Sequence, residues 1–238
     1  MTQQQLREYL DRFVQTLGHQ DRDFVEGRLK SLVSVFPFNE YEYILMFLRD
    51  RSVISFEEYE ELRNTYVSAN RYLGLFGLAP RIFGQIWGEQ HLMDLDSRFR
   101  NADKSVDPEH EGQYDLWIEG VRVEVKAARA IDTRKRGDLV SKALGTDSDE
   151  PFWMNFQQLK LDVSDVVIFI GVWVDAIRYW VLSHDDVETS PFRSHQHRGG
   201  VEYQIGITDR NVAAFDKYQV QPARVADKVT HIGREDRG

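Results

Sequence analysis

The chain has 238 residues, of which 42% are hydrophobic and 29% charged, with a formal net charge of −9 and no cysteine. This composition is that of an ordinary globular protein long enough for a substantial core. The lack of cysteine excludes disulfides and thiolate metal sites, and no run approaches the roughly 18 apolar residues of a membrane span. We therefore expect a cytoplasmic protein without a membrane partner.

Residues 1–78 are predicted to form a helical N-terminal region. Apolar residues recur at helical spacing between Leu6 and Leu17. Ser55 and Glu58 have the spacing of a capping box at the start of another helix. The region has no evident catalytic constellation, so it is interpreted as a dimerisation or DNA-positioning element, or as a purely structural helical cap.

Residues 79–238 mix helical and strand patterns and are predicted to form a catalytic domain. The expected elements are a helix over Pro80–Leu95, a strand and loop over Arg98–Glu111, a β-hairpin over Tyr114–Arg129, a short helix over Asp138–Leu144, a helix over Trp153–Leu161, a buried strand over Asp165–Trp173, a strand over Ile177–Leu182 and a strand over Val201–Ile207. Helices mixed with hairpin strands and a buried central strand predict an α/β fold with a mixed sheet.

The predicted hairpin carries three charged residues that are suited to phosphoryl chemistry. If Glu119-Gly120 is a two-residue turn, opposed positions sum to 239 and Asp115 lies across from Glu124. Lys126 follows Glu124 by two residues and leaves the same face. Two carboxylates roughly 5 Å apart repel each other unless a cation lies between them. The spacing therefore predicts a divalent metal site.

Phosphodiester hydrolysis builds negative charge on a phosphate that is already anionic. Mg²⁺ neutralises such charge and prefers hard oxygen ligands. Asp115 and Glu124 supply carboxylates, and the carbonyl of Val125 is placed to add a third ligand. Lys126 can orient or help activate water and stabilise the pentavalent phosphate.

Asp115 followed by Glu124-Val125-Lys126 resembles the signature of the PD-(D/E)xK nuclease superfamily, with Tyr114 in the place of the proline. The resemblance implies a restriction-endonuclease-like αβββαβ core with a mixed central sheet flanked by helices. It implies that Asp115 and Glu124 bind Mg²⁺ and that Lys126 is the catalytic lysine. It also implies catalytic roles for Glu89, on the preceding helix, and for Gln158, on the helix expected after the motif.

Local charge differs from the overall negative balance. The segment Arg122–Lys142 holds seven basic and three acidic residues. Such a basic segment beside an acidic metal site suits a polyanionic substrate, although a solvated charged loop would have the same composition. The predicted DNA-binding residues are Arg129, Arg134, Lys135, Arg136, Arg193, His195, His197 and Arg198.

The leading hypothesis is a Mg²⁺-dependent endonuclease that cuts double-stranded DNA, resembling a type II restriction enzyme. One site per chain favours a symmetric homodimer for cutting both strands. The alternatives are a DNA-repair or structure-specific nuclease with the same core, and a non-catalytic DNA-binding protein with an inert nuclease fold.

Overall fold

The computed structural model describes residues 3–31, 39–160, 163–195 and 202–235. The chain separates into two compact units. The first unit comprises residues 1–77 with the segments 137–149 and 173–176, and the second comprises residues 78–136, 150–172 and 177–238.

The described residues between 3 and 77 are mainly helical, in agreement with the helical pattern of the sequence. Its elements are α1 (Gln3–Thr16), α2 (His19–Ser31), α3 (Asn39–Asp50), α4 (Phe56–Ala69) and the 3₁₀ helix η1 (Leu73–Gly77). Their apolar faces share a core that includes Leu10, Leu45 and Leu48. Across the described residues, no helix is long and apolar enough to cross a bilayer.

The capping box predicted before α4 is present. The Ser55 hydroxyl accepts a hydrogen bond from the Glu58 N–H at 3.1 Å, and the Glu58 carboxylate accepts one from the Ser55 N–H at 2.8 Å. Two N–H groups that the helix leaves unpaired are thereby satisfied.

The second unit is α/β and contains two sheets. Its helical elements are the π-helix η2 (Ile82–Trp87), α5 (Gly88–Leu95), α6 (His184–Glu188), η3 (Val212–Tyr218), η4 (Pro222–Arg224) and α7 (Val225–Glu235). Its strands are β1 (Arg100–Asn101), β2 (Leu116–Ile118), β3 (Val121–Arg129), β4 (Trp153–Leu159), β5 (Val166–Val172), β6 (Ile177–Ser183), β7 (Arg193–His195), β8 (Tyr203–Thr208) and β9 (Gln219–Val220). Six strands form a sheet in the order β1-β2-β3-β5-β6-β9, and the other three form a sheet in the order β4-β8-β7.

The six-stranded sheet is mixed, because β3 and β5 are parallel whereas the other neighbours are antiparallel. The strand β5 is buried along its whole length, which confirms the prediction for its apolar sequence. The predicted strand at Ile177 is likewise confirmed as β6.

The hairpin has the predicted turn and register. Glu119 and Gly120 both have positive φ angles, 47° and 92°, as a two-residue turn of this kind requires. The paired residues sum to 239, as predicted, and are Leu116 with Val123, Trp117 with Arg122, and Ile118 with Val121.

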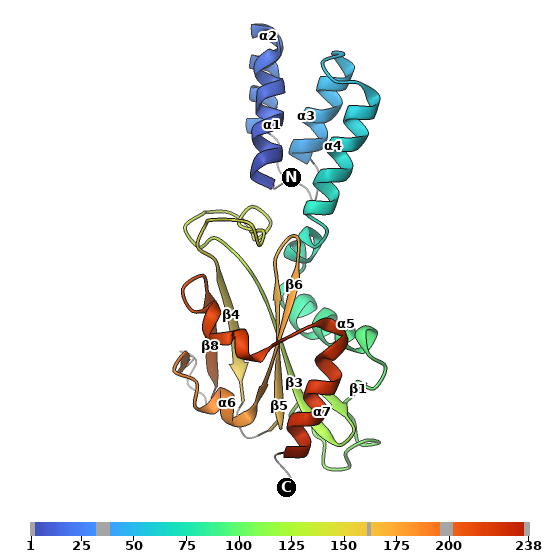
Figure 1. Cartoon of the computed structure of the whole chain (residues 1–238), viewed down its shortest axis with the longest axis vertical. Helices are drawn as coiled ribbons and strands as arrows, with labels where there is room; N and C mark the ends of the chain where they lie inside the picture. The colour runs from blue at the N-terminus through green and yellow to red at the C-terminus, as the bar shows by residue number, and fades with distance from the viewer. Residues whose placement is uncertain (1–2, 32–38, 161–162, 196–201, 236–238) are drawn as a thin grey trace. The chain divides into compact units, whose positions relative to one another are not determined.

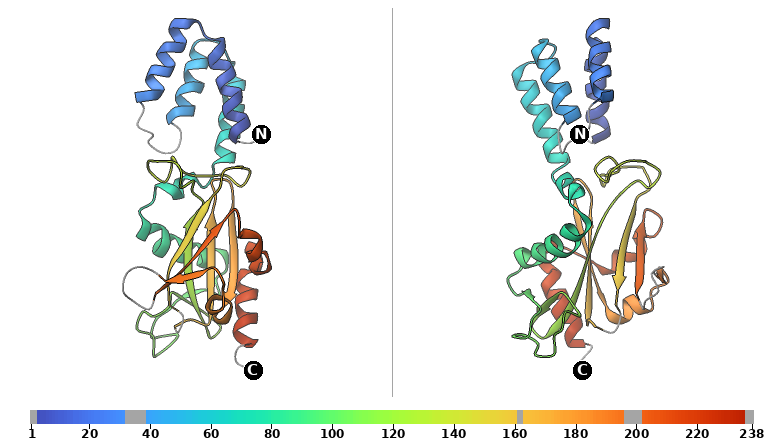
Figure 2. Two further views of the ribbon diagram at one scale, coloured as in Figure 1. Left: turned by 90° about the vertical axis from the view of Figure 1, so that its left-hand side faces the viewer. Right: turned by 180° about the vertical axis from the view of Figure 1, so that it is seen from behind.

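The helices α5 and α7 lie on one face of the six-stranded sheet, and the three-stranded sheet covers the other (Figure 1, Figure 2). On the helical face, Gly88 of α5 lies against Val125, and Gly233 of α7 lies against Val121. On the other face, the rings of Phe156 (β4) and Phe169 (β5) stack with centroids 4.3 Å apart. The side chains of β3 therefore alternate between a helical layer and a second sheet.

Two predicted helices are wrong. Residues 153–159 form β4, in which Met154, Phe156 and Leu159 are buried. This alternation is interrupted by a register shift between Phe156 and Leu159, which gives the apolar residues a spacing that resembles a helix. Residues 138–144 form turns in place of the short helix, with the Ser141 N–H bonded to the Asp138 carboxylate at 2.8 Å.

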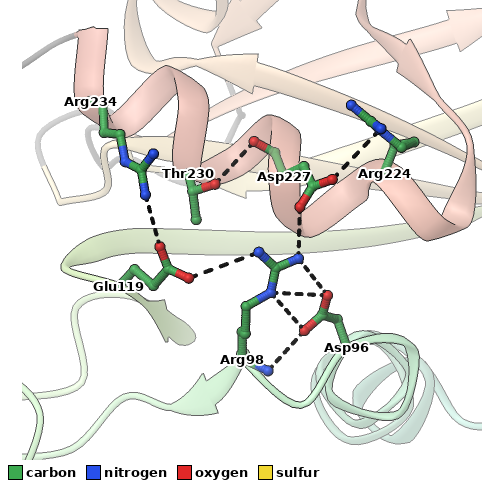
Figure 3. A network of polar contacts seen from close by, with 7 residues as sticks. All are labelled: Asp96, Arg98, Glu119, Arg224, Asp227, Thr230 and Arg234. Carbon is green, nitrogen blue, oxygen red and sulfur yellow. Dashed lines mark hydrogen bonds and ion pairs between the residues drawn. The ribbon is translucent and has the colours of Figure 1, made fainter.

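A charged network holds α7 to the sheet (Figure 3). Arg98, which follows α5, contacts Asp96 at 2.7 Å and Asp227 of α7 at 2.8 Å. Arg234, near the end of α7, contacts Glu119 in the hairpin turn at 3.2 Å. The network thus links the β2–β3 turn, the end of α5 and α7, and it keeps α5 in place beside β3.

Candidate active site

The candidate site lies where β3 extends beyond its hairpin partner. Pairing with β2 ends at Val123, whereas pairing with β5 continues from Val123 to Arg129. From Glu124 onward, β3 therefore pairs with β5 along one edge and no longer pairs with β2 along the other edge.

Asp115 lies one residue before β2 and is not paired in the strand, which corrects the expectation that it directly faces Glu124 across a ladder. Its N–H donates to the Val123 carbonyl at 3.1 Å, and its carboxylate accepts from the Val125 N–H at 2.8 Å. A side chain that bonds to the neighbouring backbone in this way is fixed against the strand. The carboxylate is therefore held at the edge of β3.

Glu124 and Lys126 are joined directly. The Lys126 Nζ lies 2.5 Å from a carboxylate oxygen of Glu124. The Glu124 side chain is only 5% exposed. Its burial raises the pKa of its carboxyl group, and Asp115 raises that pKa further, whereas Lys126 lowers it. Glu124 is thus a buried acid whose charge depends on a nearby cation.

Glu89 joins this group from α5. Loss of hydration raises the pKa of Glu89 from 4.5 to about 7, and the charges of Asp115 and Glu124 add to that effect while Lys126 opposes it. The preceding π-helix, with Gly88 packed against Val125, brings the start of α5 close to β3. A carboxyl group with a pKa near neutrality can take up or release a proton at working pH.

Glu89, Asp115 and Glu124 supply three carboxylates, and the charges of Asp115 and Glu124 both raise the pKa of Glu89. Such a group of carboxylates is a donor set suited to a hard divalent cation. The N–H of Val125 points towards Asp115, and the carbonyl of a strand residue points to the same side as its N–H. The carbonyl of Val125 therefore lies on the edge of β3 that carries Asp115, as a third ligand would require.

Tyr114, the residue before Asp115, anchors the loop that leads into the site. It is buried, and its hydroxyl donates to the Asp107 carboxylate at 2.6 Å. This contact fixes the backbone immediately before Asp115.

Gln158 lies on β4 and not on a helix. It is exposed, has a φ angle of 58°, and forms part of the register shift in β4. Lys160, two residues later, acts electrostatically on Glu124 and lowers the pKa of that carboxyl group. No sequence pattern points to Lys160, because a segment interpreted as a helix gives no indication that this residue lies near the hairpin.

Two of the predicted DNA-binding residues, Arg129 and Arg134, already have partners within the protein. Arg129 is buried, donates to the Leu78 carbonyl at 2.7 Å, and lies 3.9 Å from the centroid of the Phe83 ring. Burial lowers its pKa to about 10. Arg134 is exposed but forms ion pairs with Asp132 and Glu150. Arg129 is therefore held inside the protein and is not available as a surface contact for DNA.

The remaining basic residues are spread over two segments. Lys135 and Arg136 are exposed in the loop after β3. Arg193 lies over the Tyr203 ring at 4.5 Å, and the exposed His195 lies on the same short strand, β7. The predicted contacts His197 and Arg198 lie outside the described residues.

A second group of possible metal ligands is found among the described residues. His184, Asp185 and Glu188 on α6 have ligand atoms within 4.8 Å of one another. Both carboxylates are exposed, and clusters of this kind occur on many surfaces without a metal. None of these residues acts on the pKa of Glu89 or Glu124.

Comparison with known proteins gives no family for the chain, since no protein-family model and no curated protein matches it.

Proposed function

We propose that this protein is a Mg²⁺-dependent nuclease that hydrolyses phosphodiester bonds. The observation that carries the proposal is the convergence of Glu89, Asp115 and Glu124 with Lys126. These residues come from a helix, the residue before a strand, and a central strand, and the charges of Asp115, Glu124 and Lys126 all act on the pKa of Glu89. Perturbed acids grouped with a lysine are characteristic of reaction centres.

Asp115, Glu124 and the Val125 carbonyl would hold the metal, with Glu89 beside them. When bound, Mg²⁺ neutralises phosphate charge and makes a coordinated water more acidic. In the proposed reaction, a water oxygen attacks phosphorus, the bond to the leaving oxygen breaks, and that oxygen takes up a proton. Lys126 supplies a positive charge next to the phosphate as negative charge develops on it. The proton from the attacking water can pass to Glu89, whose pKa is about 7.

The order of elements supports a resemblance to the PD-(D/E)xK nucleases. A helix (α5) precedes the hairpin strands, and a buried strand (β5) lies parallel to the strand that carries Glu124 and Lys126. One departure separates this chain from the expected αβββαβ order, because the segment between β3 and β5 contains a strand in place of a helix. The second unit has an α/β fold with a mixed sheet, and we propose that its core is restriction-endonuclease-like.

We propose double-stranded DNA as the substrate, cut at specific sequences by a homodimer in the manner of a type II restriction enzyme. Lys135, Arg136, Arg193 and His195 are the described residues that we propose as DNA contacts. Phosphate contacts of this kind fix the position of the protein on a duplex, and base contacts decide the sequence. A symmetric dimer would bring two sites to the two strands.

The test is incubation of the purified protein with supercoiled and linear plasmid in Mg²⁺ or EDTA. We expect discrete fragments in Mg²⁺, none in EDTA, and none from Asp115→Ala or Lys126→Ala. Cleavage that survives either substitution would refute the site. Cutting at random positions, or only in branched or damaged DNA, would refute the restriction function and leave a nuclease. Binding of DNA without cleavage would leave only a DNA-binding protein.

A further inference from the structure

We propose that Lys160 is a second lysine of the candidate site and that its ammonium group binds a phosphate of the DNA strand being cut. The proposal rests on the proposed function, and it adds a residue from the strand that replaces the expected helix. Three observations support it: the path of β4, the backbone distortion just before Lys160, and the charge around Glu124.

The path of β4 returns Lys160 to the level of Glu124. An antiparallel bridge joins Ile131 to Trp153, with N···O distances of 3.4 and 3.0 Å. Glu124 lies seven residues before Ile131, and Lys160 lies seven residues after Trp153. Because strands advance roughly 3.3 Å per residue, the two segments return from the bridge by nearly the same distance. The register shift in β4 alters this by about one residue.

Packing between the sheets independently places Lys160 at this end of β3, to within about two residues of the level of Glu124. Phe156 of β4 stacks on Phe169 of β5, and Phe169 is the register partner of Lys126. Partners in register leave the same face of a sheet, so Glu124 and Lys126 lie on the face that β4 covers. Lys160 follows Phe156 along β4 by four residues, towards the Glu124 end of the site.

The backbone before Lys160 is distorted in the way that often accompanies functional residues. Gln158 has a φ angle of 58°, an uncommon conformation for a residue other than glycine. It falls within the irregular pairing between Phe156 and Leu159. Irregularities of this kind redirect side chains and occur often next to active sites. Leu159 is consequently buried, and Lys160 is exposed at the end of the strand.

Lys160 lies within electrostatic reach of Glu124, the most buried acid of the site. Lys126 is already paired with Glu124 at 2.5 Å. An exposed second ammonium close to these groups is therefore available to a phosphate entering from solvent. Two lysines on separate strands would hold a phosphodiester between them, which one lysine cannot do.

The first experiment measures Mg²⁺ binding by calorimetry without DNA. Lys160→Ala removes a positive charge near Glu124, so we expect Mg²⁺ affinity to rise about two- to fivefold. Lys160→Arg keeps the charge and should leave the affinity near that of the parent. Lys228→Ala, which removes a lysine from α7, is the matched control and should change nothing. Unchanged Mg²⁺ affinity in Lys160→Ala would overturn the proposed location.

The second experiment measures DNA affinity against salt concentration, with Ca²⁺ in place of Mg²⁺. Loss of one phosphate contact should reduce the slope of log affinity against log salt by about 1 in Lys160→Ala, and Lys160→Arg should restore it. An unchanged slope, in a parent protein that cleaves DNA, would overturn the role of Lys160 alone. Failure of the parent protein to cleave any DNA would instead refute the proposed function.

Discussion

Glu89 and Glu124 both lose hydration in the folded protein, and this burial is the largest cause of the raised pKa of each carboxyl group. A carboxyl group whose pKa is raised in the folded state favours folding only while it is protonated. The site is therefore built at a cost to the stability of the metal-free protein. At the scale of single residues, this cost is measurable.

Replacing Glu89 with glutamine should stabilise the metal-free protein at high pH. The stabilising contribution of protonated Glu89 is fully present below its unfolded pKa of 4.5 and is lost as pH rises through about 7. This loss does not occur in Glu89→Gln. We therefore expect the difference in unfolding free energy, variant minus parent, to be about 1–2 kcal/mol larger at pH 8 than at pH 5. Urea unfolding in EDTA at both pH values measures the difference. A constant difference would contradict the raised pKa.

Replacing Lys126 with alanine should have the opposite effect on stability. Glu124 would remain buried without its ammonium partner, and we expect the metal-free variant to lose about 2–4 kcal/mol at pH 8. The loss should be smaller at pH 5, where Glu124 can be protonated. The double variant Glu124→Gln/Lys126→Ala is the control and should recover part of the loss, since no buried charge remains. Equal losses in the single and double variants would rule out this account.

At the scale of elements, the sequence predicts the hairpin well and β4 poorly. The two-residue turn at Glu119-Gly120 sets the register, and alternating valines mark the strand face, so local signals suffice. In β4 the buried residues Met154, Phe156 and Leu159 are spaced by two and then three, because a register shift interrupts the strand. Only pairing with β8, which is distant in sequence, decides that this segment is extended.

The residues of the candidate site likewise differ in whether local sequence signals can predict their positions. Asp115, Glu124 and Lys126 share one hairpin, so their proximity follows from local geometry. The electrostatic effect of Lys160 on Glu124 depends on the course of β4 after its bridge to Ile131, which no local pattern reveals. The burial of Arg129 depends on Phe83, a residue from another element. Contacts between residues of different elements therefore cannot be predicted from local sequence patterns.

The packing of α7 on β3 depends on the absence of a side chain at Gly233. A Cβ added there would lie 2.3 Å from a methyl carbon of Val121, a buried residue with no room to move. We expect Gly233→Ala to destabilise the protein by about 1–3 kcal/mol through overpacking. Thermal unfolding measures this loss. Gly27→Ala, in α2 with open space around its Cβ, is the control and should not destabilise. A Gly233→Ala variant as stable as the parent would contradict the close contact.

At the scale of the whole molecule, the charge balance opposes the proposed substrate. The chain has a formal net charge of −9, and the carboxylates of the candidate site add local repulsion towards a phosphate. The proposed basic contacts are few, and Arg134 is already paired with acids. DNA binding by such a protein requires that a divalent cation first reduce the negative charge at the site.

DNA affinity should therefore depend on divalent cations even without cleavage. We expect binding in Ca²⁺, which takes the same oxygen ligands as Mg²⁺, to be at least about tenfold tighter than in EDTA at low salt. The variant Asp115→Asn/Glu124→Gln removes two of the repelling charges. It should bind DNA in EDTA more tightly than the parent does and gain little from Ca²⁺. Fluorescence anisotropy with a labelled duplex measures all four conditions. If the parent binds equally in Ca²⁺ and EDTA, the carboxylates do not face the phosphate, and the DNA must lie on another surface.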